Sequence, residues 1–149
     1  MEKNRRIFPE HCRIEELNAM TAGNMGETLG MEFTQIGADF LCARMPVDHR
    51  TRQPYGILHG GASVALAETL CSVAANLVLP KETNAYAVGL EINANHIKSV
   101  REGFVIGTCR ALQLGRKISV WEVQIRNEAG ELTCVSRMTA AILEKRPKG

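Results

Sequence analysis

A single acid, Glu68, stands inside the most apolar stretch of the sequence, residues 62–79. No basic residue lies three or four positions from it, where a helix would place a partner. A buried carboxylate without a partner is costly, and burial raises its pKa. Glu68 is therefore a candidate general base or nucleophile whose basicity is tuned by burial. The alternative is that Glu68 points to a solvent-lined edge and has no chemical role.

The sequence His59-Gly60-Gly61 comes directly before this stretch. N–H groups at the start of a helix lack partners within the helix, and glycine lets a substrate approach them closely. Such groups can stabilise a developing oxyanion. Gln53, on the preceding loop, could orient a carbonyl group or a water molecule. The alternative is that the glycines only let the chain turn, that His59 caps the helix, and that Gln53 is solvated.

The case for chemistry rests on the proximity of these residues. Gln53, His59, Gly60 and Glu68 fall within sixteen positions, on one loop and the helix that follows it. A carboxylate and backbone donors are what acyl transfer to water requires, without a metal or organic cofactor. The run around Ser63 imitates a nucleophile elbow, but it lacks the final glycine and no strand leads directly into it. We therefore set aside Ser63 as a nucleophile.

Composition and spacing argue against several other classes. Lys and Arg number 18 against 16 Asp and Glu, a net charge of +2, which is not the footprint of a nucleic-acid binder. The five cysteines are scattered and never form Cys-x-x-Cys, so we expect no disulfide framework, no zinc site and a reducing cytoplasm. The four histidines lack a metal-ligand spacing, and no glycine-rich phosphate-binding motif is present. We expect no metal.

The sequence also gives no indication of export or membrane contact. The charged N-terminal segment is not followed by an apolar stretch, so we expect no secretory signal. Residues 62–79 include Glu68 and several other polar residues, which makes this stretch too polar for a membrane span. We expect a cytoplasmic protein with no membrane partner.

The elements that must position these residues can be read from periodicity. Residues 14–20 have a short helical spacing, and residues 32–36 and 40–47 are two short strands joined by a turn. The stretch that ends at Pro80 is rich in Ala and Leu, and about 20 residues of this kind favour a helix. Alternating residues from 85 to 95 predict a long strand, and three more strands follow at 104–114, 118–126 and 132–143. The short turns between them predict a four-stranded antiparallel meander.

This order of elements predicts an α+β fold. Apolar residues surround the long helix on nearly every side, so we expect an antiparallel sheet that curls around one central helix. The length fits a single domain spanning residues 1–149, with about twelve N-terminal and five C-terminal residues at its periphery.

Four segments of the sequence resemble one family. They are Met45-Pro46-Val47-Asp48-His49-Arg50-Thr51-Arg52-Gln53-Pro54-Tyr55-Gly56-Ile57-Leu58-His59-Gly60-Gly61-Ala62-Ser63 followed by Ala67-Glu68-Thr69, then Val88-Gly89-Leu90-Glu91-Ile92-Asn93-Ala94-Asn95-His96, Leu114-Gly115-Arg116 and Val135-Ser136-Arg137. They resemble the hotdog-fold acyl-CoA thioesterases of the PaaI-like group. Within that group the chain looks most like the 1,4-dihydroxy-2-naphthoyl-CoA hydrolases and the enterobactin proofreading thioesterases. The resemblance implies a hotdog fold, in which a curled antiparallel sheet wraps one long helix.

The resemblance also implies roles for individual residues. Glu68 matches the catalytic carboxylate, which attacks the thioester carbon or activates water, and the two routes stay open. Gly60 matches the glycine whose N–H polarises the thioester carbonyl. Gln53 and His59 match residues that position the carbonyl, the water or the leaving thiolate, and Ser72 matches a residue near the acyl group or the water.

Two further expectations concern CoA and other copies of the chain. Family sites are built across the interface of a homodimer, usually within a homotetramer, so Glu68 would face the partner's Gln53 and His59 region. The phosphates of CoA need cations, for which His96, Arg101, Arg116 and Lys117 are candidates.

The leading hypothesis is hydrolysis of an acyl-CoA or aroyl-CoA thioester. One alternative is a proofreading thioesterase that acts on a misacylated acyl carrier protein. Another is a non-catalytic acyl-CoA-binding protein, which would bind its ligand in the same groove without turnover.

Overall fold

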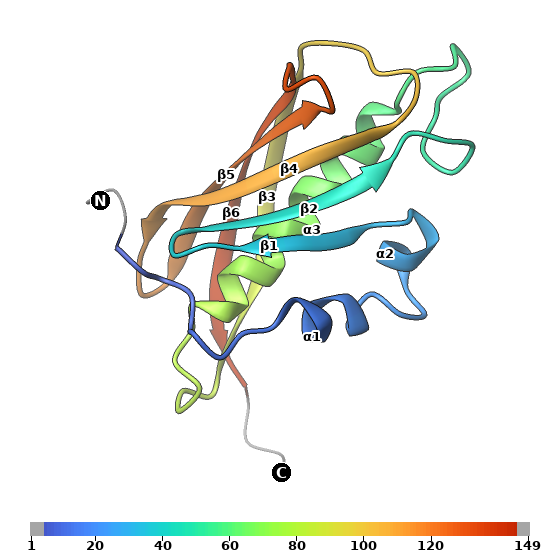
Figure 1. Cartoon of the computed structure of the whole chain (residues 1–149). Coiled ribbons are helices and arrows are strands. Elements are labelled where there is room, and N and C mark those ends of the chain that lie inside the picture. The colour runs from blue at the N-terminus through green and yellow to red at the C-terminus, as the bar shows by residue number, and fades with distance from the viewer. Residues whose placement is uncertain (1–4, 146–149) are drawn as a thin grey trace.

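The structure, a computed structural model, describes residues 5–145. Residues 1–4 and 146–149 belong to the ends that we expect to be peripheral, and they lie outside the described residues. Three helices and six strands follow one another along the chain (Figure 1): α1 (Ile14–Ala19), α2 (Met25–Thr28), β1 (Glu32–Ile36), β2 (Phe40–Pro46), α3 (Gly60–Leu77), β3 (Ala85–His96), β4 (Phe104–Leu114), β5 (Ile118–Asn127) and β6 (Leu132–Glu144).

The six strands form one antiparallel sheet with the order β1-β2-β4-β5-β6-β3. The predicted four-stranded meander is therefore wrong in one connection. Strands β4, β5 and β6 are consecutive neighbours, but β3 pairs with β6 and not with β4. Residues 97–103 carry the chain from the β3 edge to β4, which pairs with β2 on its other side. As a result, β3 is an edge strand of the sheet.

The predicted alternation along β3 is also interrupted. A β-bulge between Gly89 and Glu91 shifts the register against β6. Before the bulge Ala87 is buried while Val88 is exposed, and after it Ile92 is half-buried. Because an extra residue in one strand reverses the faces that follow, no single alternation can describe the whole strand. Leu90, in the bulge, is 68% exposed.

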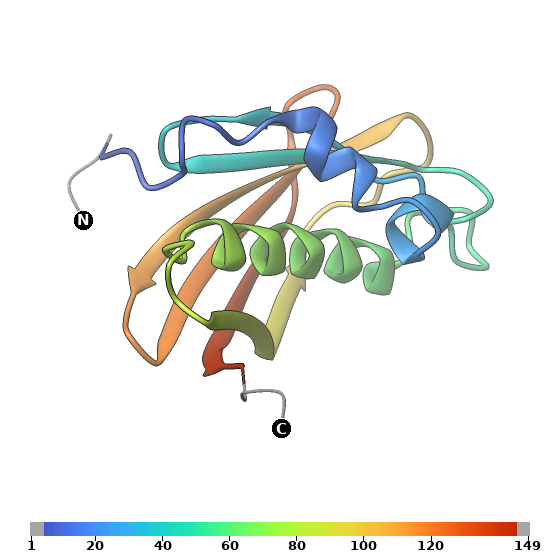
Figure 2. The same cartoon turned by 90° about the horizontal axis from the view of Figure 1, so that it is seen from below.

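The sheet curves around α3, and the core lies between them. Leu66 and Leu70 of α3 are fully buried and belong to the same cluster as Met45, Trp121 and Val123 of the strands. Figure 2 shows the sheet along one side of the helix, while the opposite side of the helix is uncovered. The expected α+β architecture with a central helix is confirmed, but a single chain does not enclose that helix on every side.

The N-terminal segment contributes to the core, which differs from the peripheral role expected for the first dozen residues. Phe8 is 1% exposed and stacks on Trp121 with ring centroids 6.3 Å apart. The Ile7 N–H also donates to the carbonyl of Ala38, with N and O 2.8 Å apart. A large aromatic side chain that finds a buried partner fixes an otherwise polar segment to the domain.

Candidate functional site

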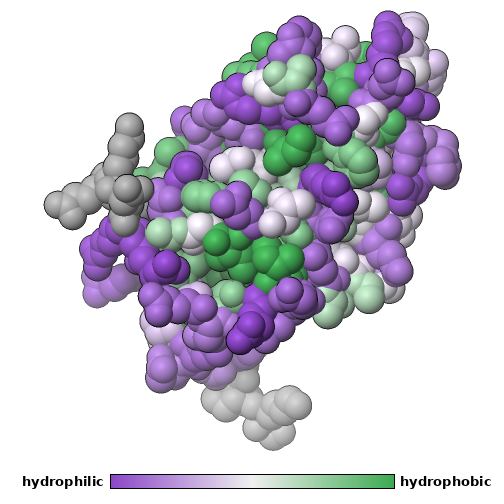
Figure 3. All heavy atoms as spheres, in the orientation of Figure 1, coloured by the Kyte–Doolittle hydropathy of each residue, from purple (hydrophilic) through white to green (hydrophobic). Residues whose placement is uncertain are grey.

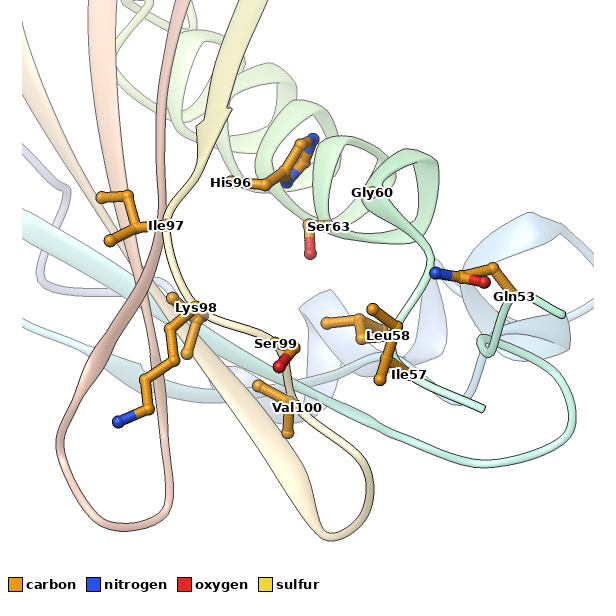
Figure 4. Close-up of a pocket in the computed structure, with 11 residues that line it drawn as sticks. Gln53, Ile57, Leu58, Gly60, Ser63, His96, Ile97, Lys98, Ser99 and Val100 are labelled. Atoms are coloured by element: carbon orange, nitrogen blue, oxygen red, sulfur yellow. The ribbon is translucent and has the colours of Figure 1, made fainter. Parts of the chain in front are cut away.

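A hollow of about 310 Å³ lies at the N-terminal end of α3. Its wall comes from the loop before α3, the first turns of α3, the end of β3 and the segment after β3 (Figure 4). The lining residues are Gln53, Ile57, Leu58, Gly60, Ser63, His96, Ile97, Lys98, Ser99, Val100 and Thr133. The structure thus brings together three of the predicted site residues, Gln53, Gly60 and His96.

The first turn of α3 leaves one backbone donor free. His59 is the N-cap, and its Nδ1 accepts the N–H of Gly61 at 2.8 Å. The N–H groups of Ala62 and Ser63 donate to the carbonyl of His59. Across residues 5–145, no acceptor is paired with the Gly60 N–H. This donor is therefore available to a ligand, whereas the exposed His59 ring serves the helix start and does not line the hollow.

The exposed His96 ring packs against Gly60, so a larger residue at this position would have to displace the ring. A Cβ atom at this position would lie 2.7 Å from the His96 Nε2 atom. This distance is shorter than any ordinary contact between such atoms. The end of β3 therefore lies directly against the start of α3, and a ligand can approach the Gly60 backbone from the hollow.

Gln53 presents its amide nitrogen to the same hollow. Its Oε1 accepts the N–H of Tyr55 at 2.7 Å, which orients the side chain. Figure 4 shows the amide nitrogen on the side of the hollow. The guanidinium of Arg52 donates to the carbonyl of Arg101 at 2.9 and 2.6 Å, so it ties this loop to the segment after β3. Two N–H donors, those of Gln53 and Gly60, consequently face one space.

Glu68 is exposed in the single chain, which corrects the expectation that it is buried. It does not line the hollow. It is eight residues beyond Gly60, which is about 12 Å along a helix axis. Its carboxylate rests against β3, where a Cβ on Gly89 would be 3.0 Å from Oε1. An apolar neighbourhood in the sequence does not by itself bury a side chain.

Ser72 is one turn beyond Glu68, and it lines a different hollow of about 330 Å³ between α1 and α3. Leu17, Met20, Val73, Asn76 and Leu77 complete that lining, which is mostly apolar. On the face of the molecule that Figure 3 shows, hydrophilic side chains dominate the rim and hydrophobic ones gather near the middle. Ser72 and Glu68 therefore share the side of α3 that leads away from the Gly60 hollow.

The four candidate cations for CoA are divided between the two ends of α3. His96 lines the Gly60 hollow, and Arg101 lies on the adjacent segment. Arg116 instead lines a separate hollow of about 620 Å³ with Val78 and Leu79, at the C-terminal end of α3. Lys117 is next to it in the β4–β5 turn. The structure does not bring these four residues together within one chain.

Lys98 and Ser63 also line the hollow, although the sequence analysis does not name Lys98 and sets Ser63 aside as a nucleophile. Lys98 is half-exposed at the wall and forms an ion pair with Glu131, and hydrogen bonds from Lys98 and Asn127 lower the pKa of that carboxyl. Ser63 is 3% exposed, and its hydroxyl points into the hollow (Figure 4). The place of Lys98, two residues after His96, could have indicated it, because both follow the same strand. Within residues 5–145, no cluster of His, Cys, Asp or Glu could hold a metal, and no helix is long and apolar enough to cross a membrane.

The sequence matches a known family over more than half of its length. The description of that family is "Thioesterase superfamily", and the match covers residues 55–134. This range begins just after Gln53 and includes Gly60, Glu68 and His96.

Curated relatives are similar over nearly the whole chain. A 1,4-dihydroxy-2-naphthoyl-CoA hydrolase from Escherichia coli (strain K12) is 53% identical over 92% of this chain and 99% of that protein. A proofreading thioesterase from Cronobacter turicensis is 47% identical over 92% of this chain and 98% of that protein. A crystal structure of a Haemophilus influenzae thioesterase superposes with a TM-score of 0.89 at 44% identity, covering 93% of this chain and 95% of that one.

Proposed function

Since the chain belongs to the thioesterase superfamily and is a thioester hydrolase with a hotdog fold, we propose that it hydrolyses acyl-CoA or aroyl-CoA thioesters. Substrates resembling 1,4-dihydroxy-2-naphthoyl-CoA or benzoyl-CoA fit best, because the E. coli relative is named for the former. The observation that carries this proposal is the pair of free donors, the Gly60 N–H and the Gln53 amide, that face one hollow.

In this proposal the two donors bind the thioester carbonyl oxygen. A carbonyl oxygen has two lone pairs and accepts both hydrogen bonds. When the carbonyl carbon is attacked, negative charge develops on this oxygen. Donors that already point at the oxygen, at the positive end of a helix dipole, stabilise that charge without reorganising. His59 supports this arrangement by capping the helix and holding its first turn in place.

The carboxylate in each site comes from a second copy of the chain. Within one chain Glu68 is about 12 Å along α3 from Gly60 and faces away from the hollow, so it cannot reach a carbonyl bound there. The edge strand β3 has no neighbouring strand on its outer side within residues 5–145, although the Asn76 side chain bonds the backbone of Ala87. Glu68 rests on Gly89 of this strand, and Gly60 rests against His96 near its end. An antiparallel pairing of two β3 edges would set each Glu68 beside the partner's Gly60.

Hydrolysis then proceeds by either of two routes that use the same carboxylate. As a general base, Glu68 takes a proton from water while the oxygen of that water bonds to the carbonyl carbon. As a nucleophile, Glu68 itself bonds to that carbon and forms an anhydride, which water then opens. In both routes the C–S bond breaks with its electron pair on sulfur, the thiolate takes up a proton, and one water is consumed. A single turnover in ¹⁸O-labelled water separates the routes. The general-base route puts one ¹⁸O into the first acid product, whereas an anhydride that water opens at the Glu68 carboxyl carbon gives a first product without ¹⁸O.

The remaining predicted residues take peripheral parts in this proposal. His96 lines the hollow along which the CoA arm runs, together with Lys98, and Arg101 lies beside its outer end. Ser72 shares the side of Glu68, so it lies near the acyl group. Arg116 and Lys117 are at the far end of α3 and would meet CoA only when they come from another protomer. We place the protein in the cytoplasm as a homodimer that assembles into a homotetramer.

The test is release of free thiol from benzoyl-CoA by the purified protein. Removing the charge of the carboxylate in Glu68→Gln lowers kcat by about 10²- to 10⁴-fold, the range of a lost general base. The variant keeps its fold because Glu68 is exposed. Equal rates for the two proteins would remove Glu68 from the mechanism. Saturable binding of benzoyl-CoA without turnover by the wild type would identify a binding protein instead.

A second function, proofreading of a misacylated carrier protein, is favoured by the 47% identity to the proofreading thioesterase of Cronobacter turicensis. The chemistry is the same, and only the carrier of the pantetheine arm differs. Comparison of kcat/KM for benzoyl-CoA and for a benzoylated acyl carrier protein decides between the two functions. A higher value for the carrier protein would assign proofreading.

A further inference from the structure

Ser63 is a buried residue whose hydroxyl opens to the hollow. It is 3% exposed, yet none of the hydrogen bonds among residues 5–145 involves its Oγ atom. Other buried hydroxyls in the same structure are paired. Thr133 donates to the carbonyl of Ile125 at 3.0 Å, and Ser119 accepts the indole N–H of Trp121 at 2.8 Å. Among residues 5–145 every fully buried side-chain N or O atom has a hydrogen-bond partner. The Ser63 oxygen is therefore reached from the hollow, and it is free to bond a ligand there.

The direction of the Ser63 hydroxyl indicates what it could bond. Ser63 lies three residues after Gly60, so the two share a face of α3, where such positions are about 5–6 Å apart. Figure 4 shows the Ser63 oxygen pointing away from the helix into the hollow that Gly60 and Gln53 also face. The hydroxyl is thus a donor without an acceptor, within a few ångströms of the place where a thioester carbonyl would bind.

Four other groups near the carbonyl site already have a hydrogen-bond partner or a role in the proposed function. The Gly60 N–H and the Gln53 amide both serve the carbonyl oxygen in the proposed function. The Nδ1 of His59 holds the N–H of Gly61, and its ring is outside the hollow. The ammonium of Lys98 is paired with Glu131. For the sulfur atom, which carries the negative charge once the C–S bond breaks, the lining then offers the Ser63 and Ser99 hydroxyls and the His96 ring. Of these, only Ser63 lies on α3 beside Gly60.

We propose that the Ser63 hydroxyl donates a hydrogen bond to the thioester sulfur and stabilises the departing thiolate. The inference rests on the proposed hydrolysis and adds a catalytic residue to it. As the C–S bond breaks, its electron pair moves to sulfur, and the Ser63 O–H orients toward that charge without giving up its proton. The thiolate is later protonated by Glu68 or by water. No bond to Ser63 forms at any stage.

The experiment compares Ser63→Ala with the wild type on two benzoyl thioesters that differ in the leaving group. For S-benzoyl-N-acetylcysteamine, an alkyl thioester, kcat falls about 10- to 100-fold, the effect of losing a hydrogen bond to a charged group. For the 4-nitrothiophenyl ester, whose thiolate is stable on its own, the loss stays within about twofold. A structural role for Ser63 would lower both rates equally, and that result overturns the proposal. Equal rates of wild type and variant on both esters would overturn it as well.

A stability measurement supplies an independent readout. Because the hydroxyl has no partner in the folded chain and alanine favours helices, the thermal midpoint of Ser63→Ala is equal to or higher than that of the wild type. The matched control is Ser119→Ala, which removes an equally buried hydroxyl, 2% exposed, that has a partner away from the hollow. This control lowers the midpoint and leaves kcat unchanged. A midpoint of Ser63→Ala that falls as far as that of Ser119→Ala would contradict the proposal.

The two proposals fail in different ways. If the wild type releases no thiol from any thioester, the proposed function fails. If the wild type is active and Glu68→Gln is not, while Ser63→Ala keeps its full rate on the alkyl thioester, only the role of Ser63 is overturned.

Discussion

The start and the middle of α3 are two regions of one helix with opposite surroundings. At its start, Gly60 and Ser63 line a hollow whose other walls come from two loops and the end of β3. In its middle, Glu68 is exposed, and its carboxylate lies against Gly89 of β3. A helix is a rigid rod that advances 1.5 Å per residue, so it fixes the distance between these regions and cannot shorten it. One chain therefore holds the Gly60 hollow and Glu68 at separate places on the same helix, and in the proposed function a second copy brings them together.

Complementation between two inactive variants tests whether Glu68 and the Gly60 hollow act together from different chains, and we expect it to give the largest effect. Glu68→Gln removes the carboxylate in the middle of α3, and Gln53→Ala removes the amide donor of the Gly60 hollow. When the two proteins are unfolded together and refolded as a mixture, half of the dimers are mixed, and each mixed dimer holds one intact site. Activity therefore recovers to about a quarter of the wild-type value, from the statistics of a two-fold dimer.

The control is each variant taken alone through the same refolding. A mixture that shows only the sum of the two separate activities would mean that the carboxylate and the amide donor act within one chain, and the comparison would fail.

The contact between Gly60 and His96 predicts how a larger residue at the start of α3 changes stability and activity. In Gly60→Ala the new Cβ would lie 2.7 Å from the His96 Nε2 atom. We expect the variant to lose about 1–3 kcal/mol of unfolding free energy, as overpacked sites do, and to lose activity as the N–H moves. Urea denaturation measures the first effect. In the background of His96→Ala, the new Cβ of Gly60→Ala has room, and alanine then stabilises the first turn of α3. A double variant as unstable as Gly60→Ala alone would contradict this explanation.

Asn76 links α3 to the edge strand. Its amide nitrogen donates to the carbonyl of Ala87 at 2.9 Å, and its oxygen accepts the N–H of the same residue at 2.9 Å. Asn76→Ala leaves both backbone groups unpaired, and we expect it to lower the unfolding free energy by about 1–2 kcal/mol. Asn93→Ala is a matched control because that amide bonds only the exposed Glu91 side chain. Equal effects of the two substitutions in urea denaturation would show that Asn76 does not hold the strand.

The smallest effect is a dependence on pH at the loop that leads to the hollow. Hydrogen bonds from Arg50 lower the pKa of Asp48 from its ordinary value of 3.8 to about 2. A lowered pKa stabilises the fold fully above about pH 4, and this contribution is lost as the pH falls through about 2. The pair is partly exposed, so we expect less than about 1 kcal/mol. Asp48→Asn removes this part of the acid dependence of thermal unfolding, and an unchanged profile would exclude Asp48 as its source.

Local patterns in the sequence indicated most of the elements but not their pairing. Alternation and turn residues placed all six strands, and a run rich in Ala and Leu placed α3, observed as Gly60–Leu77. The four-residue helix α2 has too few positions for a period to be recognised. The short turn before β4 predicted a hairpin with β3, but the turn does not determine which strands become neighbours. Nothing in the alternation announced the bulge at Gly89.

In the candidate site, too, the sequence indicated which residues take part but not how they are surrounded. Spacing along the chain indicated Gln53 and Gly60, and His96 was a candidate cation for CoA at a strand end; the structure brings the three together. The sequence could not show whether Glu68 is buried or exposed, since an apolar helix does not reveal whether a sheet or a second chain covers each of its faces. Ser63 was weighed only as a nucleophile, because a sequence shows which residue carries a hydroxyl but not that the hydroxyl lacks a partner.

The single tryptophan gives this fold a built-in optical reporter. Trp121 is fully buried, its indole N–H donates to Ser119, and its ring stacks on Phe8 of the N-terminal segment. Its fluorescence therefore comes from one defined, water-free environment. If the N-terminal segment detaches before the sheet opens, the emission reddens while the far-ultraviolet circular dichroism of the strands persists, so the order in which the two parts separate can be followed without a label.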